Sequence, residues 1–368
     1  MTVLLAGRLA RAGAVEDGWV EIEGERIVSA DSGTPPRPPD ERHDGIIAPG
    51  LCDLQVNGAG GHEVSDGPAA LDAIDAIQLQ HGVTSYLPTI VSMDDEVADR
   101  SVSELAERAA DPSSPVAGIH LEGPFLSRVH AGMHRPDCLR SPANGVPEYF
   151  SSPAVRLVTL APELPGALDL IAALRDRGVA VSLGHSGASA EIARRALDAG
   201  AGLVTHLFNA MAPLHHRAPG LAGVALADSR PLVGIIADGL HVDPLVLELV
   251  RRAAGPRVVL VSDATPAAAA PPGRYRLAGI EIESTDAGIV RTAEGRLAGS
   301  ALTLDAAMRN WMSMTRASLG GAIAAASEVP AAALGLTIGL RPGCAADIVL
   351  LDDAGGVERV MRLGRWLS

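Results

Sequence analysis

Eight short apolar segments recur along the chain, and nearly all of them end in polar residues or glycine. Continuous apolar runs of this kind are typical of parallel strands that are buried on both faces of a sheet. The predicted strands lie within residues 46–56, 84–90, 116–122, 155–163, 179–186, 202–209, 232–238 and 258–264.

Stretches with the apolar periodicity of helices separate many of these strands. The predicted helices cover residues 68–80, 94–109, 166–177, 188–199 and 244–253. Alternating strands and helices imply right-handed βαβ units. Eight such strands predict an α/β fold, a (β/α)8 TIM-type barrel. An open doubly wound sheet is the alternative that this pattern leaves open.

The two ends of the chain have a different pattern, with short β-like pieces separated by turns. Neither end is long enough to bury a core alone. We therefore expect residues 1–48 and 336–368 to pair into one small β-sandwich domain, with residues 49–335 forming the barrel. Residues 273–297 interrupt the barrel pattern with hairpin-like segments, and they are interpreted as an excursion from the last strand–helix loop.

Composition agrees with this division. The 368 residues suffice for one barrel of ~250 residues and a small second domain. Hydrophobic residues make up 47% of the chain and aromatic residues only 2%, so the core must consist mainly of aliphatic side chains. The net charge of -14 disfavours a broad nucleic-acid-binding face.

Three cysteines, Cys52, Cys138 and Cys344, stand far apart without a CxxC motif. This is not a disulfide framework, and it favours a reducing compartment, so a cytoplasmic location is expected. The first residues lack the features of a signal peptide, and no apolar stretch of about 20 residues predicts a membrane span.

The chemistry-bearing residues follow the predicted strands, where the active site of a barrel lies. Glu122 ends the third strand, His185 ends the fifth and His206 ends the sixth. One carboxylate and two imidazoles converging from three strand ends predict a catalytic zinc-type site with an open coordination position. Taken singly, each could be a hydrogen-bonded core histidine or a loop glutamate.

Asp263 ends the eighth strand at the same rim. It could merely cap the following turn, or it could act as a general base beside the metal site. His134 and His241 are further candidates at the rim. Arg217 follows two histidines in PLHHRAPG, and this loop is a candidate anion clamp.

In order, these motifs resemble the N-acetylglucosamine-6-phosphate deacetylases of the amidohydrolase superfamily. The resemblance rests on PGLCDLQVNGAGG, HLEGPF, GHSGAS, THLFNAM, ADGLHV, VSDAT and LAGSALTLDAAMRN, and it extends to the terminal PGCAADIVLLD. It implies a hydrolase that removes the acetyl group from an amino-sugar phosphate in amino-sugar catabolism, as a homodimer with one divalent metal ion per chain, expected to be Zn²⁺.

The resemblance also implies roles for particular residues. Glu122, His185 and His206 would bind the metal, and Asp263 would be the catalytic acid and base. The implied substrate-binding residues are Met133, His134, Asn209, Ala210, Arg217, Asp238, Gly239, Leu240, His241, Leu297, Ala298 and Gly299.

One departure from the wider superfamily stands at the end of the first strand. The usual His-x-His, which holds a second metal, is replaced by Gln55-Val56-Asn57. Amide side chains are poor zinc ligands, so this predicts a single metal ion. The alternatives left open are a deacetylase for another N-acetyl sugar phosphate, such as the galactosamine type, and an aminoacylase-like enzyme. A non-catalytic binding protein is disfavoured by the ligand set together with Asp263.

Overall fold

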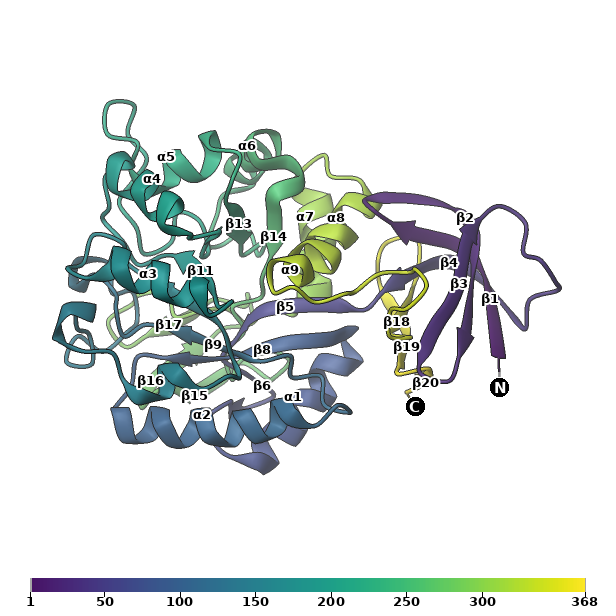
Figure 1. The fold of residues 1–368 in the computed structure, drawn as a ribbon, viewed down its shortest axis with the longest axis horizontal. Helices are drawn as coiled ribbons and strands as arrows, with labels where there is room; N and C mark the ends of the chain where they lie inside the picture. Colours follow the sequence, from purple (N-terminus) through teal and green to yellow (C-terminus); the bar gives the residue numbers. More distant parts are fainter. Residues whose placement is uncertain (1, 368) are drawn as a thin grey trace.

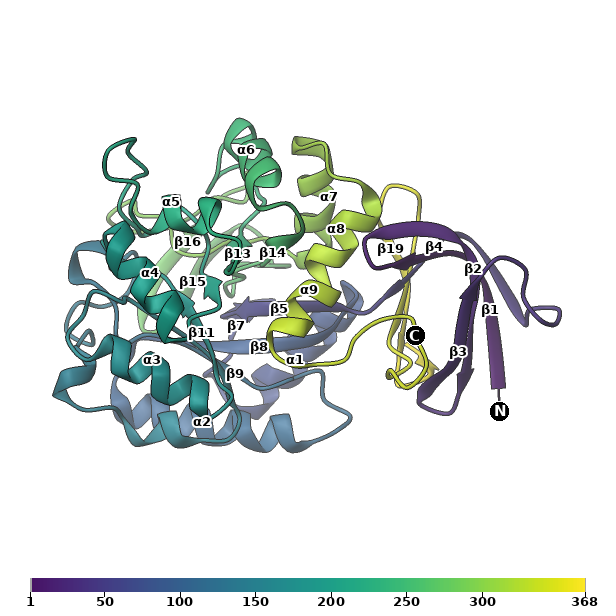
Figure 2. The same ribbon diagram turned by 45° about the horizontal axis from the view of Figure 1, so that its top comes forward.

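The computed structural model describes residues 2–367 and separates the chain into a barrel and a smaller sheet that lies to one side of it (Figures 1 and 2). The barrel contains eight parallel strands in one continuous order. They are β5 (Leu51–Val56), β8 (Val83–Val91), β9 (Ile119–Glu122), β10 (Val155–Leu160), β11 (Ala180–Leu183), β12 (Leu203–Val204), β13 (Leu232–Ile235) and β14 (Val258–Leu260). Each falls within or overlaps a predicted segment.

The sheet closes where its first and last strands meet. The backbone N–H of Asn57 donates to the carbonyl oxygen of Ala264 at 2.7 Å, and Val56 forms a parallel bridge with the same residue. An open doubly wound sheet has no contact of this kind between its edge strands. The predicted (β/α)8 barrel is therefore confirmed.

The helices surround the barrel (Figure 1). The five predicted ones are present, with ends shifted by at most two residues. α4 begins at Ala190 because the hydroxyl of Ser189 accepts a hydrogen bond from the backbone N–H of Ile192 and caps the helix. The helices are α1 (Pro68–Gln80), α2 (Asp95–Ala110), α3 (Ala167–Asp176), α4 (Ala190–Ala199), α5 (Gly220–Ala227), α6 (Pro244–Ala254), α7 (Leu304–Met314), α8 (Leu319–Ala326) and α9 (Glu328–Ala333). Among the residues described, no helix is long and apolar enough to cross a bilayer.

Both ends of the chain contribute to the second sheet, as predicted. Its seven strands follow the order β20-β19-β18-β4-β1-β2-β3. They are β1 (Thr2–Arg11), β2 (Ala14–Glu23), β3 (Arg26–Ser32), β4 (Glu41–Pro49), β18 (Ile348–Leu351), β19 (Val357–Arg362) and β20 (Arg365–Trp366).

This terminal sheet curls around its own core instead of splitting into two sheets. Ile27 of β3 and Met361 of β19 stand near opposite ends of the strand order, yet they share one buried cluster. The backbone N–H of Ile27 also donates to the carbonyl oxygen of Cys344 at 3.0 Å, which draws the two ends together. The largest buried cluster covers the barrel and also includes Ala10, Ile46 and Val349 of the terminal sheet. The division into residues 1–48, 49–335 and 336–368 stays a prediction.

The predicted excursion after the eighth strand is an antiparallel three-stranded sheet. It consists of β15 (Gly273–Leu277), β16 (Ile280–Ser284) and β17 (Val290–Thr292). The backbone N–H of Ala278, in its first turn, donates at 3.0 Å to the carboxylate of Glu63, in the short strand β7 (His62–Glu63) that pairs with β6 (Gly58–Ala59) after β5. The excursion thus lies against the rim at which the barrel strands end.

Leu350→Ala should test whether the terminal sheet is held by its own core. Leu350 is only 2% exposed within that cluster, and deleting a buried leucine side chain costs about 2–5 kcal/mol. Urea unfolding should show a loss of this size. Leu367→Ala, at a side chain that is 38% exposed, should change the free energy of unfolding by less than about 0.5 kcal/mol. Equal losses in the two variants would contradict this account.

Candidate metal centre and active site

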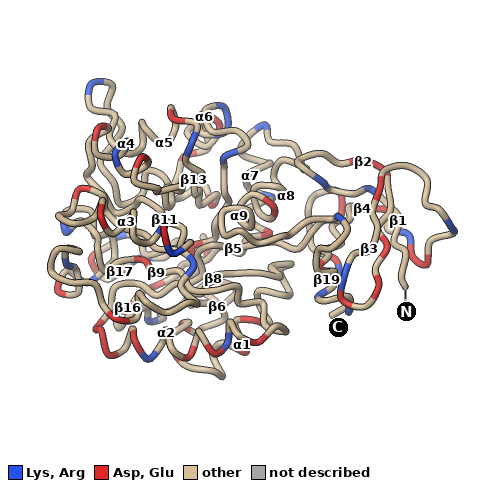
Figure 3. The backbone as a smooth tube through the Cα atoms, in the orientation of Figure 1, with Lys and Arg blue, Asp and Glu red and all other residues tan. Residues whose placement is uncertain are grey.

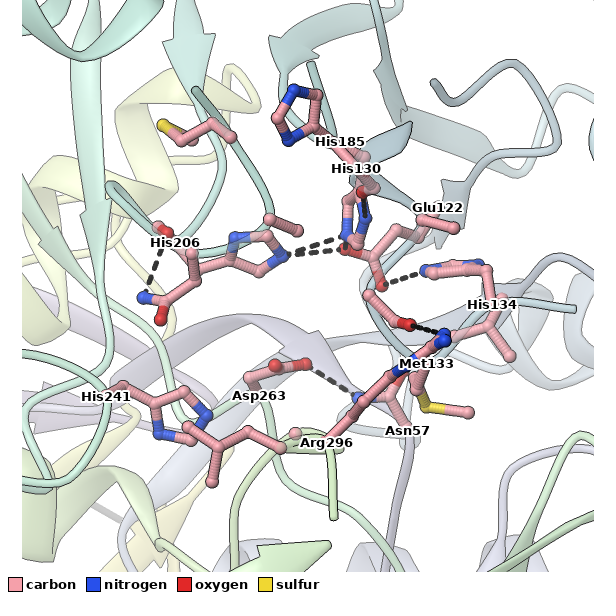
Figure 4. Close-up of a pocket in the computed structure, with 18 of the residues that line it drawn as sticks. Asn57, Glu122, His130, Met133, His134, His185, His206, His241, Asp263 and Arg296 are labelled. Atoms are coloured by element: carbon pink, nitrogen blue, oxygen red, sulfur yellow. Dashed lines mark hydrogen bonds and ion pairs between the residues drawn. The ribbon is translucent and has the colours of Figure 1, made fainter. Parts of the chain in front are cut away.

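Three side chains from three strand ends converge at the barrel mouth, as the sequence predicts (Figure 4). Glu122 comes from β9, while His185 and His206 follow β11 and β12. Oε1 of Glu122 lies 3.2 Å from Nε2 of His185 and 3.1 Å from Nε2 of His206, and the two nitrogens are 3.2 Å apart. All three residues are buried.

This spacing fits a tetrahedral cation. Ligands at ~2.0–2.1 Å around zinc stand ~3.3 Å apart along the edges of the tetrahedron. Nδ1 of His185 donates to the carbonyl oxygen of His130 at 3.0 Å, so Nε2 of a neutral His185 ring presents its lone pair to the cluster. A lone pair facing a carboxylate oxygen at this distance is stable only with a positive charge between them. The residues present therefore fit a divalent metal ion.

The charges of Glu122 and His185 agree with that fit. Burial alone would raise the pKa of Glu122, but hydrogen bonds with His134, His185 and His206 lower it well below its usual range, so Glu122 is a carboxylate. Burial lowers the pKa of His185 to about 4, which keeps that ring neutral. For His206, burial is the largest single influence and favours the neutral ring, but the hydrogen bond with Glu122 and the negative charges of Glu122 and Asp263 together outweigh it and raise the pKa.

Asp263 faces this cluster from the end of β14. Oδ1 accepts two hydrogen bonds at 2.9 Å, one from Nε2 of Gln55 and one from Nδ2 of Asn57. Gln55 also donates to Oε1 of Glu122 at 3.0 Å. Burial, and then the negative charge of Glu122, raise the pKa of Asp263 to about 6. Gln55 and Asn57, which stand where His-x-His is usual, therefore donate hydrogen bonds to the carboxylates of Glu122 and Asp263.

The backbone is strained where these side chains are presented. Non-glycine residues rarely adopt positive φ, yet His185 (49°), His206 (24°), Ala210 (50°) and Asp263 (48°) all do. Gly299 packs directly on one of these turns, because a Cβ there would lie 2.8 Å from the carbonyl oxygen of Asp263. Strain of this kind concentrates at functional sites.

Two further histidines face the same space. Nδ1 of His134 accepts from the backbone N–H of Ser92 at 3.2 Å, so Nε2 carries the proton and points toward Oε2 of Glu122, 3.7 Å away. Nδ1 of His241 lies 2.6 Å from Oδ2 of Asp238. Burial would raise the pKa of Asp238, but its bonds with His241 lower it, so this carboxylate orients the ring.

A cavity of about 580 Å³ opens above the cluster and brings most of the predicted site residues together. Those lining it are Glu122, Met133, His134, His185, His206, Asn209, Ala210, His241, Asp263, Leu297 and Gly299.

Other predicted residues do not line this cavity. Asp238, Gly239 and Leu240 form the turn behind His241, and Ala298 is fully buried. Arg217 lies on an exposed loop beside His216, outside the cavity of its own chain.

The cavity also contains residues that sequence reasoning missed as site residues, namely Asn57, Arg128, His130 and Arg296. Asn57 follows the first strand, where the departure from His-x-His marked it. Arg296 directly precedes the predicted Leu297–Gly299 segment, which was the only signal for it.

Comparison with known proteins agrees with this site. The amidohydrolase family profile matches residues 46–367. The chain belongs to the amidohydrolase family. It is 38% identical over 371 residues to the N-acetylgalactosamine-6-phosphate deacetylase of Escherichia coli O157:H7, with 98% of each chain covered. It is also 38% identical to the human N-acetylglucosamine-6-phosphate deacetylase, with 97% of this chain and 91% of the relative covered.

Solved structures give the same result. The N-acetyl-D-glucosamine-6-phosphate deacetylase of Mycobacterium smegmatis superposes with a TM-score of 0.93 at 35% identity over the whole of both chains. A mutant of that protein in complex with N-acetyl-D-glucosamine-6-phosphate superposes with a TM-score of 0.92. The resemblance indicated by the sequence motifs is therefore confirmed.

Glu122→Gln should abolish tight metal binding, because the amide removes the only carboxylate of the donor set. Elemental analysis after dialysis should find about one divalent ion per wild-type chain and close to none in the variant. Glu63→Gln is the control, since Glu63 is a buried glutamate near the rim whose carboxylate accepts from the backbone N–H of Ala278 instead. Two equally tight ions in the wild type, or full metal content in Glu122→Gln, would contradict the assignment.

Proposed function

We propose that this protein hydrolyses the acetamide of N-acetyl-D-glucosamine 6-phosphate to D-glucosamine 6-phosphate and acetate. The observation that carries the proposal is the convergence of a Glu-His-His donor set with a buried aspartate at the mouth of an amidohydrolase barrel. The names of the relatives supply the substrate class. The protein would accordingly be an enzyme, a hydrolase acting on linear amides.

Glu122, His185 and His206 would hold one divalent cation, which we propose to be Zn²⁺. A cation bound by these three residues would supply a Lewis acid and lower the pKa of water toward neutrality. The neutral His185 ring and the ionised Glu122 are the protonation states that such binding needs.

Asp263 is the proposed acid and base. Gln55 and Asn57 both donate to Oδ1, which leaves Oδ2 to receive the proton of the attacking water. Asp263 then returns that proton to the departing nitrogen, because an amine leaves readily only when it is protonated. A pKa of about 6 suits a group that must both accept and return a proton near neutral pH.

The remaining cavity residues would bind the substrate. Nε2–H of His134 faces the donor cluster and can donate to the acetyl carbonyl oxygen as negative charge develops on it, and His241 lines the same cavity. Leu297 and Met133 would pack against the sugar ring, and the Asn209–Ala210 turn would bind polar groups.

We also propose a cytoplasmic homodimer, as the resemblance and the cysteine pattern imply. Arg217 fits this proposal, because an arginine outside the cavity of its own chain would reach a phosphate from a second copy.

Acetate release from a panel of N-acetyl sugars should test the activity itself. N-acetyl-D-glucosamine 6-phosphate should be hydrolysed with the highest kcat/KM, ahead of its galactosamine epimer and of the unphosphorylated sugars. Metal removal with a chelator should abolish the activity, and added Zn²⁺ should restore it. A higher kcat/KM for the galactosamine 6-phosphate would reassign the substrate, and hydrolysis of N-acetyl amino acids alone would replace the proposal with an aminoacylase.

Asp263→Asn should lower kcat by about 10²–10⁴-fold, because the amide cannot accept a proton. Metal content and the Kd for substrate should stay close to wild type, since the three metal ligands remain. All three quantities should be measured on one preparation.

Asp53→Asn provides the matched control. Asp53 is also buried on the β5 side of the barrel seam, and its hydrogen bonds use Oδ1, which asparagine retains. This control should keep its kcat. A near-normal kcat in Asp263→Asn would remove Asp263 from the mechanism, and loss of metal would make it a ligand.

A further inference from the structure

A carboxylate outside the cavity holds the turn that presents His185. Glu163 stands in the loop after β10, is half-buried and does not line the cavity above the metal cluster. Its Oε2 accepts a hydrogen bond from the hydroxyl of Ser186 at 2.7 Å, and its Oε1 accepts one from the backbone N–H of Gly187 at 2.6 Å. Both donors directly follow His185 in the chain.

Glu163 uses its charge on neutral donors, in contrast to many other carboxylates of this chain. The net charge is -14, and Figure 3 shows acidic residues spread over the outer helices with arginines among them. On α6, for example, Glu248 pairs with Arg251 and Arg252. A hydrogen bond to an ionised group is about twice as strong as one between neutral groups. A carboxylate that accepts from a serine hydroxyl and a backbone N–H is therefore a strong anchor for a loop.

The other hydrogen bonds of His185 are longer and join neutral groups. Its carbonyl oxygen accepts from the backbone N–H of Ser127 at 3.0 Å, and its Nδ1 donates to the carbonyl oxygen of His130 at 3.0 Å. These bonds hold the residue from the loop after β9, whereas Glu163 holds the chain that leaves it. His185 has a φ of 49°, and a strained residue keeps its conformation only where the surrounding structure enforces it. Glu163 thus supplies the charged part of that enforcement.

Ser186 extends the same restraint to the loop of the second histidine. Its backbone N–H donates to the carbonyl oxygen of Ala210 at 3.1 Å, and its carbonyl oxygen accepts from the backbone N–H of Ala212 at 3.1 Å. Ser186 is fully buried, and Ala210, with a φ of 50°, belongs to the segment that follows His206. One carboxylate therefore acts, through one serine, on the loops of both proposed imidazole ligands.

We propose that Glu163 is a positioning residue for the metal centre. By holding Ser186 and Gly187 it fixes the position from which His185 presents Nε2, and it thereby raises the affinity of the three-residue donor cluster for a divalent cation. This assignment rests on the function proposed above only in that the cluster binds such a cation. Residues that orient metal ligands without touching the metal typically change its affinity by about 10- to 100-fold.

Glu163→Ala should raise the Kd for Zn²⁺ by roughly 10- to 100-fold, measured on the folded enzyme by competition with a chromophoric chelator. Glu163→Gln should fall between wild type and alanine, because the amide oxygen can replace only one of the two acceptors. At Zn²⁺ concentrations that saturate each variant, KM should equal that of the wild type, since Glu163 does not line the cavity.

Ser186→Ala tests the route by which Glu163 acts. This variant should also raise the Kd for Zn²⁺, because it removes one donor to the carboxylate. The double variant should lose less affinity than the product of the two single losses, since both changes delete the same hydrogen bond. Losses that multiply as independent effects would overturn the proposed action through Ser186.

Glu328→Ala is the matched control. Glu328 is also half-buried, and its carboxylate accepts from the backbone N–H of Ala12 at 3.1 Å, in the turn between β1 and β2 of the terminal sheet. It does not line the cavity. Its loss removes the same kind of bond at a place remote from the donor cluster in the chain, so the Kd for Zn²⁺ should stay at the wild-type value.

Other outcomes would separate this assignment from the proposed function. A wild-type Kd for Zn²⁺ in both Glu163 variants would overturn the assignment, and a lower melting temperature in those variants would then mark Glu163 as structural only. Suppose that the wild type binds Zn²⁺, the Glu163 variants bind it more weakly, and no N-acetyl sugar is hydrolysed. That result would overturn the proposed function and support the assignment. A wild type that binds no divalent cation would overturn both.

Discussion

The amide of Gln55 joins the two carboxylates on which the site depends. It donates to Glu122 at 3.0 Å and to Asp263 at 2.9 Å, and so links the first, third and eighth strands of the barrel. Two buried carboxylates repel each other, and each raises the other's affinity for protons. An amide can donate to both without adding charge, whereas a histidine in that position would bind a second cation. The amides of Gln55 and Asn57 thus supply uncharged donors to the two carboxylates where the wider superfamily has His-x-His.

Barrel closure makes this arrangement possible. β5 and β14 are far apart in sequence, and the contacts of Val56 and Asn57 with Ala264 are among those that join them. The strained turns at His206 and Asp263 then rotate the side chains inward, and the packing of Gly299 against Asp263 supports the second turn. Strain of about 1–3 kcal/mol at such a residue persists only where surrounding structure enforces it. The closed barrel holds these residues in their strained conformations.

The sequence predicted the parts of this site that depend on position along a strand. Glu122, His185, His206 and Asp263 each follow an apolar run, and parallel strands place such ends together whatever the loops do. The strand predicted within residues 202–209 is too long, because β12 ends at Val204 and the turn at His206 follows. The bridging role of Gln55 and the position of Arg296 depend on contacts between distant segments, and no local pattern encodes those.

In the proposed function, bond cleavage and substrate recognition use different residues of the site, and this difference bears on how related sugars would be distinguished. The cluster and Asp263 are buried where the barrel strands end, whereas Arg296 and Leu297 come from an excursion that adds no strand to the barrel. Relatives named for the glucosamine and the galactosamine phosphate are both 38% identical to this chain. These sugars differ only at C4, which is adjacent to C5 and remote from the acetamide. In the proposed function, residues outside the metal cluster would therefore distinguish them, and substitutions there could alter the preferred sugar without changing the proposed metal ligands or Asp263.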